Sequence, residues 1–286
     1  MSNLLDSNRF HFLIDALPFL SKYSGSTFVI KYGGSVMQND ILKSSVIADI
    51  CFLRLLGINL VLVHGGGLFI NDWLEKLSIE PKFHNGIRVT DFDTMQVVEM
   101  VLVGKVNREL VSLFNQNNVL SVGLSGKDAN LIKASPLFPY SNNLTGKIDS
   151  VNSSILNLLL LNNFMPVIAS VASDLNGTTY NINADTVASA IASSLNAQKL
   201  ILLTDTPGIL SDINDPCSLI KELNICKVRQ LQSLDVISGG MIPKVQSCIC
   251  ALESNVKSTH IIDGRIKHAL LYELFTHNRI GSMIVL

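Results

Sequence analysis

Short apolar runs alternate with longer segments of helical periodicity along almost the whole chain. Short runs rich in β-branched residues are typical of buried strands, and apolar residues at every third or fourth position are typical of amphipathic helices. The expected strands are 28–32, 60–64, 119–124, 166–171, 199–203, 260–262 and 283–286. The expected helices are 41–56, 68–77, 91–117, 153–164, 185–195, 228–237, 241–254 and 269–275.

Two regions depart from this alternation. Residues 84–90 predict a turn or a hairpin, and the broken pattern of 125–151, with Pro136 and Pro139, predicts small antiparallel strands. The repeated alternation elsewhere predicts an α/β fold with a mainly parallel sheet covered by helices on both faces. Ligands of such sheets bind at the carboxyl ends of the strands.

The first residues form a separate amphipathic segment. Phe10, Leu13, Ile14 and Leu17 recur at helical spacing ahead of the first expected strand, and Pro18 is expected to kink or end the helix. Two interpretations remain open, a helix that caps the core and an interaction arm between subunits.

Composition narrows the class of protein. The 286 residues are 48% hydrophobic and 16% charged, with a formal net charge of -1, which is typical of a folded globular protein. With a net charge so close to zero, the protein has no strongly basic surface that would attract nucleic acid. No apolar run approaches the roughly 18–20 residues that span a bilayer. Because the overall charge is near zero, an anionic ligand would have to be bound by groups placed locally around it.

Residue usage also gives hints about origin. The five cysteines show no metal-like spacing and are interpreted as free thiols. The chain has 25 Asn, and 15 Lys against 7 Arg, a bias that suits an AT-rich genome. This favours a plastid-encoded protein of the plastid stroma, and otherwise a protein of the bacterial cytoplasm.

The segment 59–67 is the most informative candidate for chemistry. An apolar strand ends at His64 and is followed by Gly65, Gly66 and Gly67 and then by an expected helix. Such a turn offers free backbone N–H groups to an anion, and glycine lets a ligand approach the backbone closely. The alternative is a tight connection without a ligand.

Two lysines lie beside glycine pairs. Lys31 ends the first expected strand just before Gly33 and Gly34, and Lys244 begins a helix just after Gly239 and Gly240. A lysine at an electropositive helix start indicates an anion nearby. The alternative for Lys31 is a side chain that extends to the protein surface.

Three further segments carry polar side chains at the ends of expected strands. Arg88 suits bidentate binding of a carboxylate, although a surface ion pair is the simpler reading. Asp185 is by default a helix N-cap, and Asn181 could orient a ligand. Thr204 and Asp205 come at the end of an expected strand, just before a Pro-Gly pair. This segment is either a simple turn or an edge that binds a nucleotide.

Several common motifs are missing from the sequence. Neither the P-loop pattern nor the dinucleotide-binding glycine pattern occurs, and no Cys/His spacing indicates a metal site. A Mg²⁺ ion brought by a nucleotide would need few protein ligands.

Taken in order, these motifs resemble those of the amino-acid kinase family, and within it the acetylglutamate kinases of arginine synthesis. The matching segments are 31–34, 64–67, 86–90, 181–185, 204–210 and 239–244. The pairing of His-Gly-Gly-Gly with Gly-Ile-Arg-Val-Thr at 86–90 indicates acetylglutamate as the phosphoryl acceptor.

The resemblance implies a three-layer α/β/α sandwich with a mainly parallel central sheet. It implies a helical arm at 1–26, an acceptor-binding and dimerisation lobe at 27–184, and an ATP-binding lobe with a C-terminal regulatory segment at 185–286. The implied reaction is ATP-dependent phosphorylation of the γ-carboxylate of N-acetyl-L-glutamate, with Mg²⁺ carried by the nucleotide.

The resemblance also assigns roles to residues. Lys31 and Lys244 would stabilise the transferring phosphoryl group, and Asp185 would hold both lysines. The acceptor would be bound by Gly66, Gly67, Arg88 and Asn181. The nucleotide would be bound by Gly33, Gly34, Thr204, Asp205, Gly208, Gly239 and Gly240.

Members that arginine inhibits carry an N-terminal helix that links dimers into a hexamer, and 13–19 is similar to that helix. The resemblance places the arginine site at His268, Glu273 and Gly281, although Lys267, Tyr272 and 277–279 depart from the usual pattern. Cyanobacterial and plastid members bind the signalling protein PII. Rival interpretations are a kinase of the same fold that acts on glutamate, aspartate, carbamate or UMP, and a non-catalytic nucleotide-binding regulator.

Overall fold

The computed structural model describes residues 17–19, 21–84, 87–138, 142–276 and 278–286. Most of the expected N-terminal arm, including residues 1–16, lies outside these ranges. Within them, residues 17–19 and 21–23 are helical, so Pro18 itself lies in a helical segment.

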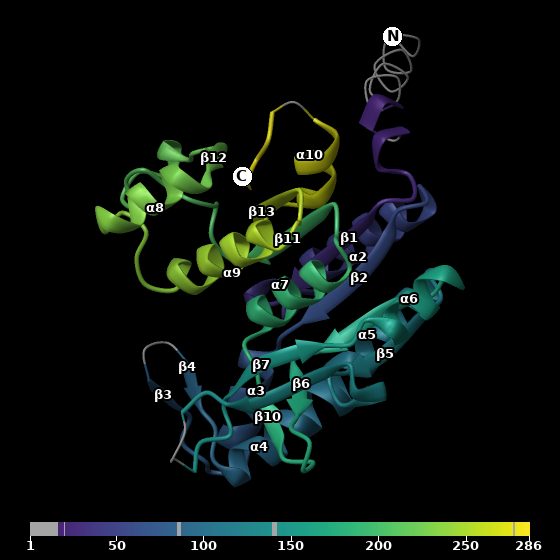
Figure 1. Cartoon of the computed structure of the whole chain (residues 1–286), viewed down its shortest axis with the longest axis vertical. Coiled ribbons are helices and arrows are strands. Elements are labelled where there is room, and N and C mark those ends of the chain that lie inside the picture. The colour runs from purple at the N-terminus through teal and green to yellow at the C-terminus, as the bar shows by residue number, and fades with distance from the viewer. Residues whose placement is uncertain (1–16, 20, 85–86, 139–141, 277) are drawn as a thin grey trace.

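A sheet of eight strands runs through the molecule (Figure 1). Its strands, in spatial order, are β12 (Glu222–Asn224), β14 (Ser282–Val285), β13 (Ser258–Asp263), β11 (Lys199–Thr204), β1 (Thr27–Tyr32), β2 (Asn59–His64), β8 (Met165–Ala169) and β5 (Ser121–Ser125). Only β13 and β14 pair antiparallel within this sheet. The expected mainly parallel sheet is therefore confirmed.

Smaller strands lie beside the sheet. A four-stranded sheet contains β10 (Thr179–Asn181), β9 (Val171–Ser173), β6 (Ile132–Pro136) and β7 (Gly146–Val151). A hairpin pairs β3 (Lys82–His84) with β4 (Ile87–Val89). The antiparallel strands expected after residue 125 are thus present as β6 and β7.

Helices cover both faces of the large sheet. One face carries α2 (Asp40–Leu55), α3 (Gly67–Lys76), α4 (Phe92–Glu99), the π-helix η2 (Met100–Val106), α5 (Asn107–Gln116) and α10 (Ala269–Phe275). The other carries α6 (Ser154–Leu161), α7 (Ala184–Ser194), α8 (Ile225–Ser233) and α9 (Met241–Glu253). Short 3₁₀ turns are η1 (Gly34–Met37), η3 (Asp128–Asn130) and η4 (Pro216–Ser218).

The alternation of side chains along the central strands explains the three layers. In β1, Phe28 and Ile30 pack into the core on one face, and Val29 packs into the core on the other. In β2, Leu60 packs into the same core as Phe28, and Val61 packs into the same core as Val29. Because neighbouring residues of a strand point to opposite faces, two apolar cores require helices on both sides.

The structure corrects three expectations. The strand expected at 166–171 ends at Ala169, because the chain leaves the large sheet at Ser170 and enters β9 of the small sheet. The helix expected at 91–117 contains a π-helical segment at its centre. The short strand β12 was not expected, since its three residues form no apolar run.

Candidate active site

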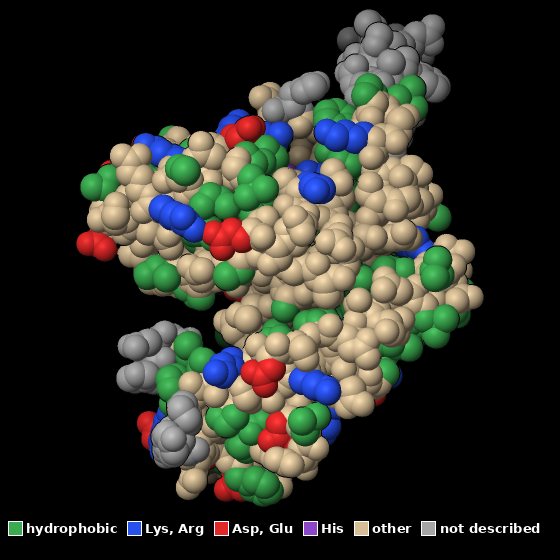
Figure 2. Space-filling model, in the orientation of Figure 1, with side chains coloured by type: hydrophobic (Ala, Val, Ile, Leu, Met, Phe, Trp, Pro, Cys, Tyr) green, Lys and Arg blue, Asp and Glu red, His purple; other side chains and the backbone are tan. Residues whose placement is uncertain are grey.

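Two pockets open where the strands of the large sheet end, and Figure 2 shows the molecule hollowed on this side between its upper and lower parts. The first has a volume of about 280 Å³ and the second about 430 Å³. The lining of the first includes Lys31, the three glycines 65–67, Arg88, Asn181 and Asp185. Lys244 lines both pockets. A group moved from one pocket to the other would therefore pass this ammonium.

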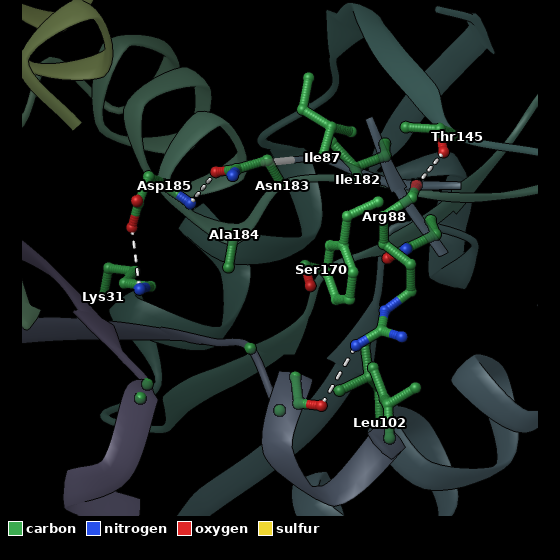
Figure 3. Close-up of a pocket in the computed structure, with 18 of the residues that line it drawn as sticks. Lys31, Ile87, Arg88, Leu102, Thr145, Ser170, Ile182, Asn183, Ala184 and Asp185 are labelled. Carbon is green, nitrogen blue, oxygen red and sulfur yellow. Dashed lines mark hydrogen bonds and ion pairs between the residues drawn. The ribbon is translucent and has the colours of Figure 1, made fainter. Parts of the chain in front are cut away.

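Three charged side chains from distant parts of the chain meet in the first pocket. The Lys31 ammonium, on β1, lies 2.9 Å from Asp185 Oδ1, and Lys244 Nζ, in the first turn of α9, donates to Asp185 Oδ2 at 2.9 Å. Figure 3 shows the Lys31–Asp185 pair at one end of the pocket. Burial alone would raise the pKa of the Asp185 carboxyl, but the two lysines lower that pKa to about 2. The carboxylate is therefore ionised at neutral pH and fixes both ammonium groups.

Asp185 is not the N-cap of α7, so the default interpretation of this residue is wrong. The side chain of Asn183 accepts hydrogen bonds from the backbone N–H groups of Asp185 and Thr186, at 2.8 and 3.2 Å. Asn183 thus performs the capping, which frees the Asp185 carboxylate for the lysines.

The glycine turn joins β2 to α3 at the wall of the first pocket. The N–H of Gly65 donates to the Tyr32 carbonyl at 3.1 Å, which ties the turn to β1. A Cβ on Gly66 would lie 2.7 Å from Leu102 Cδ2, so a larger residue could not fit here without displacing Leu102. Helix α3 starts at Gly67 and directs its electropositive end to this region.

Arg88 reaches the far end of the first pocket from β4 (Figure 3). Its Nη2 donates to the carbonyl of Gly67 at 3.3 Å and to Asn71 Oδ1, and its guanidinium lies 4.8 Å from the ring centroid of Phe83. Burial lowers the pKa of this guanidinium. Nη1 is buried with no hydrogen-bond partner among the described residues. An unpaired buried donor on a cation indicates a site for an anionic group.

Further polar residues complete this pocket, and of these the sequence singled out Asn181 but not Thr145 or Ser170. Asn181 Nδ2 donates to Thr90 Oγ1 at 3.1 Å. The Thr145 hydroxyl donates to the Arg88 carbonyl at 2.7 Å and holds β4 in place. Ser170 lies between Lys31 and Arg88 in Figure 3. The signal for Ser170 was a single serine interrupting an apolar run, but such a residue is common in buried strands.

The second pocket contains part of the predicted nucleotide set. Asp205, Gly208, Gly239 and Gly240 line it, together with the apolar side chains of Ile209, Leu210, Ile213, Val236, Ile237 and Met241. An apolar cavity with a few polar groups at its edge is suited to a flat aromatic ligand. The matching segments 204–210 and 239–244 contain Ile209, Leu210 and Met241 without assigning them a role, and Ile213, Val236 and Ile237 lie outside those segments.

The remaining predicted nucleotide residues lie elsewhere. Gly33 and Gly34 line the first pocket, where a Cβ on Gly33 would lie 3.1 Å from Lys31 Nζ. Thr204 is buried, lines neither pocket, and donates from its hydroxyl to Asp205 Oδ1 at 3.3 Å. These three residues therefore border the site rather than the second pocket itself.

The predicted arginine-site residues lie around α10, in two different settings. Glu273 is buried, and its Oε2 accepts from the N–H of Gly281 at 3.0 Å. His268 starts the helix and lies 2.7 Å from Asp49 Oδ1, through Nδ1. The sequence missed the neighbours of Glu273. His260 Nδ1 is 2.8 Å from Glu273 Oε1, and Lys199 Nζ is 3.0 Å from His260 Nε2.

Two further searches cover only the described part of the chain. Among those residues, no three or more His, Cys, Asp or Glu side chains are grouped as metal ligands. No described helix is both long enough and apolar enough to cross a membrane.

Comparison with known proteins gives consistent relatives. The model of the amino acid kinase family matches residues 26–263. Acetylglutamate kinase from Gracilaria tenuistipitata var. liui is 62% identical over 279 residues, covering 97% of this chain and 98% of that protein. Acetylglutamate kinase from Thermosynechococcus vestitus is 55% identical over 282 residues, covering 99% and 96%.

Solved structures include N-acetylglutamate synthase from Neisseria gonorrhoeae. Its complex with coenzyme A and N-acetyl-glutamate has a TM-score of 0.85 and 26% identity, and the match covers 97% of this chain but 63% of the synthase. Its complex with coenzyme A and L-arginine has a TM-score of 0.81 and 25% identity, covering 96% of this chain and 65% of the synthase.

Proposed function

The chain belongs to the amino acid kinase family, and we propose that it transfers the γ-phosphoryl group of ATP to the γ-carboxylate of N-acetyl-L-glutamate. The product is N-acetyl-L-glutamyl 5-phosphate, an intermediate of arginine synthesis. The proposal rests on the two ends of the first pocket. At one end, Lys31 and Lys244 both pair with the buried carboxylate of Asp185, and at the other end, Nη1 of Arg88 is a buried donor without a partner among the described residues. A dicarboxylate acceptor meets positive charge at both of its ends there.

The chemistry requires no general base. A γ-carboxylate with a pKa near 4.3 is already ionised at neutral pH and can attack phosphorus directly. A carboxylate oxygen forms a bond to Pγ as the bond from Pγ to the β,γ-bridging oxygen breaks, and ADP leaves. What the protein supplies is alignment and positive charge around the transferring group. Lys31 and Lys244, held by Asp185, would supply that charge.

The acceptor would lie in the first pocket. The N–H groups of Gly66 and Gly67 would bind its reacting carboxylate, Arg88 its α-carboxylate through Nη1, and Asn181 its remaining polar groups. These residues belong to 27–184, which is the proposed acceptor lobe and dimerisation lobe.

ATP would occupy the second pocket, mainly within 185–286, with its base on the apolar wall. Its phosphates would extend past Asp205, Gly239 and Gly240 to Lys244 and to the edge formed by Gly33 and Gly34. Mg²⁺ would arrive with the phosphates and neutralise part of their charge. An ion held largely by the nucleotide would need few protein ligands.

The function is tested by measuring ADP release with N-acetylglutamate, glutamate, aspartate and carbamate side by side. We expect turnover with N-acetylglutamate and little with the others. The protonated amine of glutamate or aspartate would carry a positive charge into a site that contains Lys31, Lys244 and Arg88, and carbamate has no second carboxylate for Arg88. Higher activity with glutamate or aspartate would assign the chain to another kinase of the same fold. Nucleotide binding without any turnover would favour the non-catalytic regulator.

Replacing Arg88 by lysine tests the acceptor assignment. Lysine keeps the charge but loses the planar fork that reaches Gly67, Asn71 and the substrate together. We expect kcat/KM for N-acetylglutamate to fall by about 10- to 100-fold, mostly through KM, with KM for ATP nearly unchanged. Arg229→Lys, an exposed arginine paired with Glu253, is the control. An unchanged KM for N-acetylglutamate would contradict this role.

Arginine is the proposed feedback inhibitor, with its site near Glu273, Gly281 and His268. The buried carboxylate of Glu273, on α10, is suited to a guanidinium group. We expect activity to fall as arginine rises to millimolar levels, with citrulline, which has a similar shape but no guanidinium charge, as the control. A flat response to arginine would remove the regulatory proposal without affecting the kinase assignment.

Assembly and location are proposed from the same resemblance. The chain would form a dimer, and the arm at 1–26 would link three dimers into a hexamer. PII is a candidate protein partner of that hexamer. The compositional bias supports the plastid stroma, or otherwise a bacterial cytoplasm.

A further inference from the structure

A chain of hydrogen bonds lies beneath the glycine turn and has no part in the chemistry assigned above. His64, the last residue of β2, is completely buried. Its Nε2 lies 3.0 Å from Asn107 Nδ2, and its Nδ1 lies 3.0 Å from the carbonyl oxygen of Gly65. Each ring nitrogen therefore has a partner, and the second partner belongs to the glycine turn itself.

The surroundings of Asn107 allow only one orientation of its amide. Asn107 Nδ2 is 2.8 Å from the Val167 carbonyl, which can only accept, and its Oδ1 is 2.6 Å from Arg108 Nη2, which can only donate. Nδ2 must then donate to His64 as well, so Nε2 of His64 is an acceptor. Burial lowers the pKa of His64 to about 4, so the ring is neutral at pH 7. Its single proton is on Nδ1 and is donated to the Gly65 carbonyl.

The π-helical segment places Asn107 at this position. The N–H of Asn107 donates to the Leu102 carbonyl, five residues earlier, which is the hydrogen bond that defines a π turn. In an α-helix, residues five apart are separated by about 140° around the axis. The wider turn lets Leu102 pack against Gly66 while Asn107 reaches His64. One continuous helical segment thus lies against Gly66 directly, through Leu102, and reaches the turn a second time through His64.

The Gly65 carbonyl controls the direction of a neighbouring N–H group. The C=O of Gly65 and the N–H of Gly66 belong to one planar peptide unit and point in opposite directions. The N–H of Gly65 is held separately by Tyr32. In the described part of the chain, the Gly66 N–H has no protein acceptor. Fixing the carbonyl toward His64 therefore fixes the direction in which this free N–H points.

We propose that His64 and Asn107 are positioning residues that orient the Gly65–Gly66 peptide, so that the Gly66 N–H is presented to the reacting carboxylate. This inference rests on the proposed function, because it assigns the glycine turn to the acceptor. Neither side chain lines the pocket, so both act through the backbone.

Two substitutions of His64 separate positioning from packing. In His64→Asn, the side-chain amide takes the place of Nδ1 and can still donate to the Gly65 carbonyl. In His64→Gln, the longer amide takes the place of Nε2 and can meet only Asn107. We expect His64→Gln to lower kcat with N-acetylglutamate by about 10- to 100-fold. His64→Asn should keep most of the turnover, and KM for ATP should stay unchanged in both.

A packing role predicts the opposite order, since asparagine leaves the larger cavity and should destabilise the fold more. Thermal unfolding of both variants supplies this comparison. A double-mutant cycle with Asn107→Leu adds a second measurement. If Asn107 acts through His64, Asn107→Leu should cost turnover in the natural protein but little more in His64→Gln.

Equal turnover in both His64 variants, or lower turnover in His64→Asn than in His64→Gln, would overturn the inference. Additive losses in the cycle would also overturn it. These outcomes can be distinguished from failure of the proposed function, in which the natural protein itself would release no ADP with N-acetylglutamate.

Discussion

Replacing Lys244 by alanine lowers kcat by about 10²–10³, because a preorganised cation beside a transferring phosphoryl group is lost. Lys244 is the side chain that lines both pockets, and its ammonium is fixed by Asp185 at 2.9 Å. The charge needs no reorganisation when negative charge builds up on the phosphoryl oxygens. Initial-rate measurements at saturating ATP and N-acetylglutamate give kcat directly.

Two comparisons make the Lys244 result specific. Lys31→Ala, on the opposite side of the same carboxylate, is expected to show a loss of the same order. Lys257→Ala removes an exposed lysine near the end of α9 and should leave kcat unchanged. Near-normal turnover in Lys244→Ala would show that phosphoryl transfer does not depend on this ammonium.

Replacing Asp185 by asparagine is expected to lower kcat by about 10²–10³ as well, although asparagine has nearly the same shape. The two ammonium groups would lose the carboxylate that holds them and would repel each other. Removing one partner from a buried ionic group also destabilises a protein, here by about 3 kcal/mol. Both effects can be measured, as kcat and as the free energy of unfolding in urea.

The control for this substitution is Asp93→Asn. Asp93 is the second residue of α4, as Asp185 is of α7, so both changes remove a carboxylate from the first turn of a helix. Asp93 is exposed and should lose only a few tenths of a kcal/mol of helix-dipole interaction. If Asp185→Asn behaved like Asp93→Asn, the carboxylate would be only a helix-terminal charge.

The fold could be predicted where the apolar pattern is long and regular. The central strands β1, β2 and β11 fill continuous apolar runs, because both their faces are buried. The switch of sheets at Ser170 could not be predicted, since the apolar run continues across it and the direction of the chain depends on distant partners. The π segment was missed for a related reason, because 91–117 keeps a helical pattern throughout.

The two lysines of the site could be predicted because a lysine in an apolar or glycine-rich context is costly without an anion or a partner. Arg88 was indicated only by the resemblance, since its local sequence favours a surface ion pair. The role of Asn183 was missed because Asn183 and Asp185, two residues apart, both have side chains that suit an N-cap, and only the backbone geometry selects one. The apolar wall of the second pocket had no predicted role, since in the sequence apolar residues such as Ile209 and Ile237 cannot be told from ordinary core residues.

The pairing of β1 has a consequence for how the chain is made on the ribosome. Phe28, in β1, pairs with Lys199 of β11 on one side and with Leu60 of β2 on the other. During synthesis, β1 and β2 emerge early, but one edge of β1 has no neighbour until β11 is complete. That edge is apolar on both faces and is a template for unwanted pairing while it waits. A long-range pairing of this kind slows folding, so the nascent chain has most need of chaperone protection before residue 204 emerges.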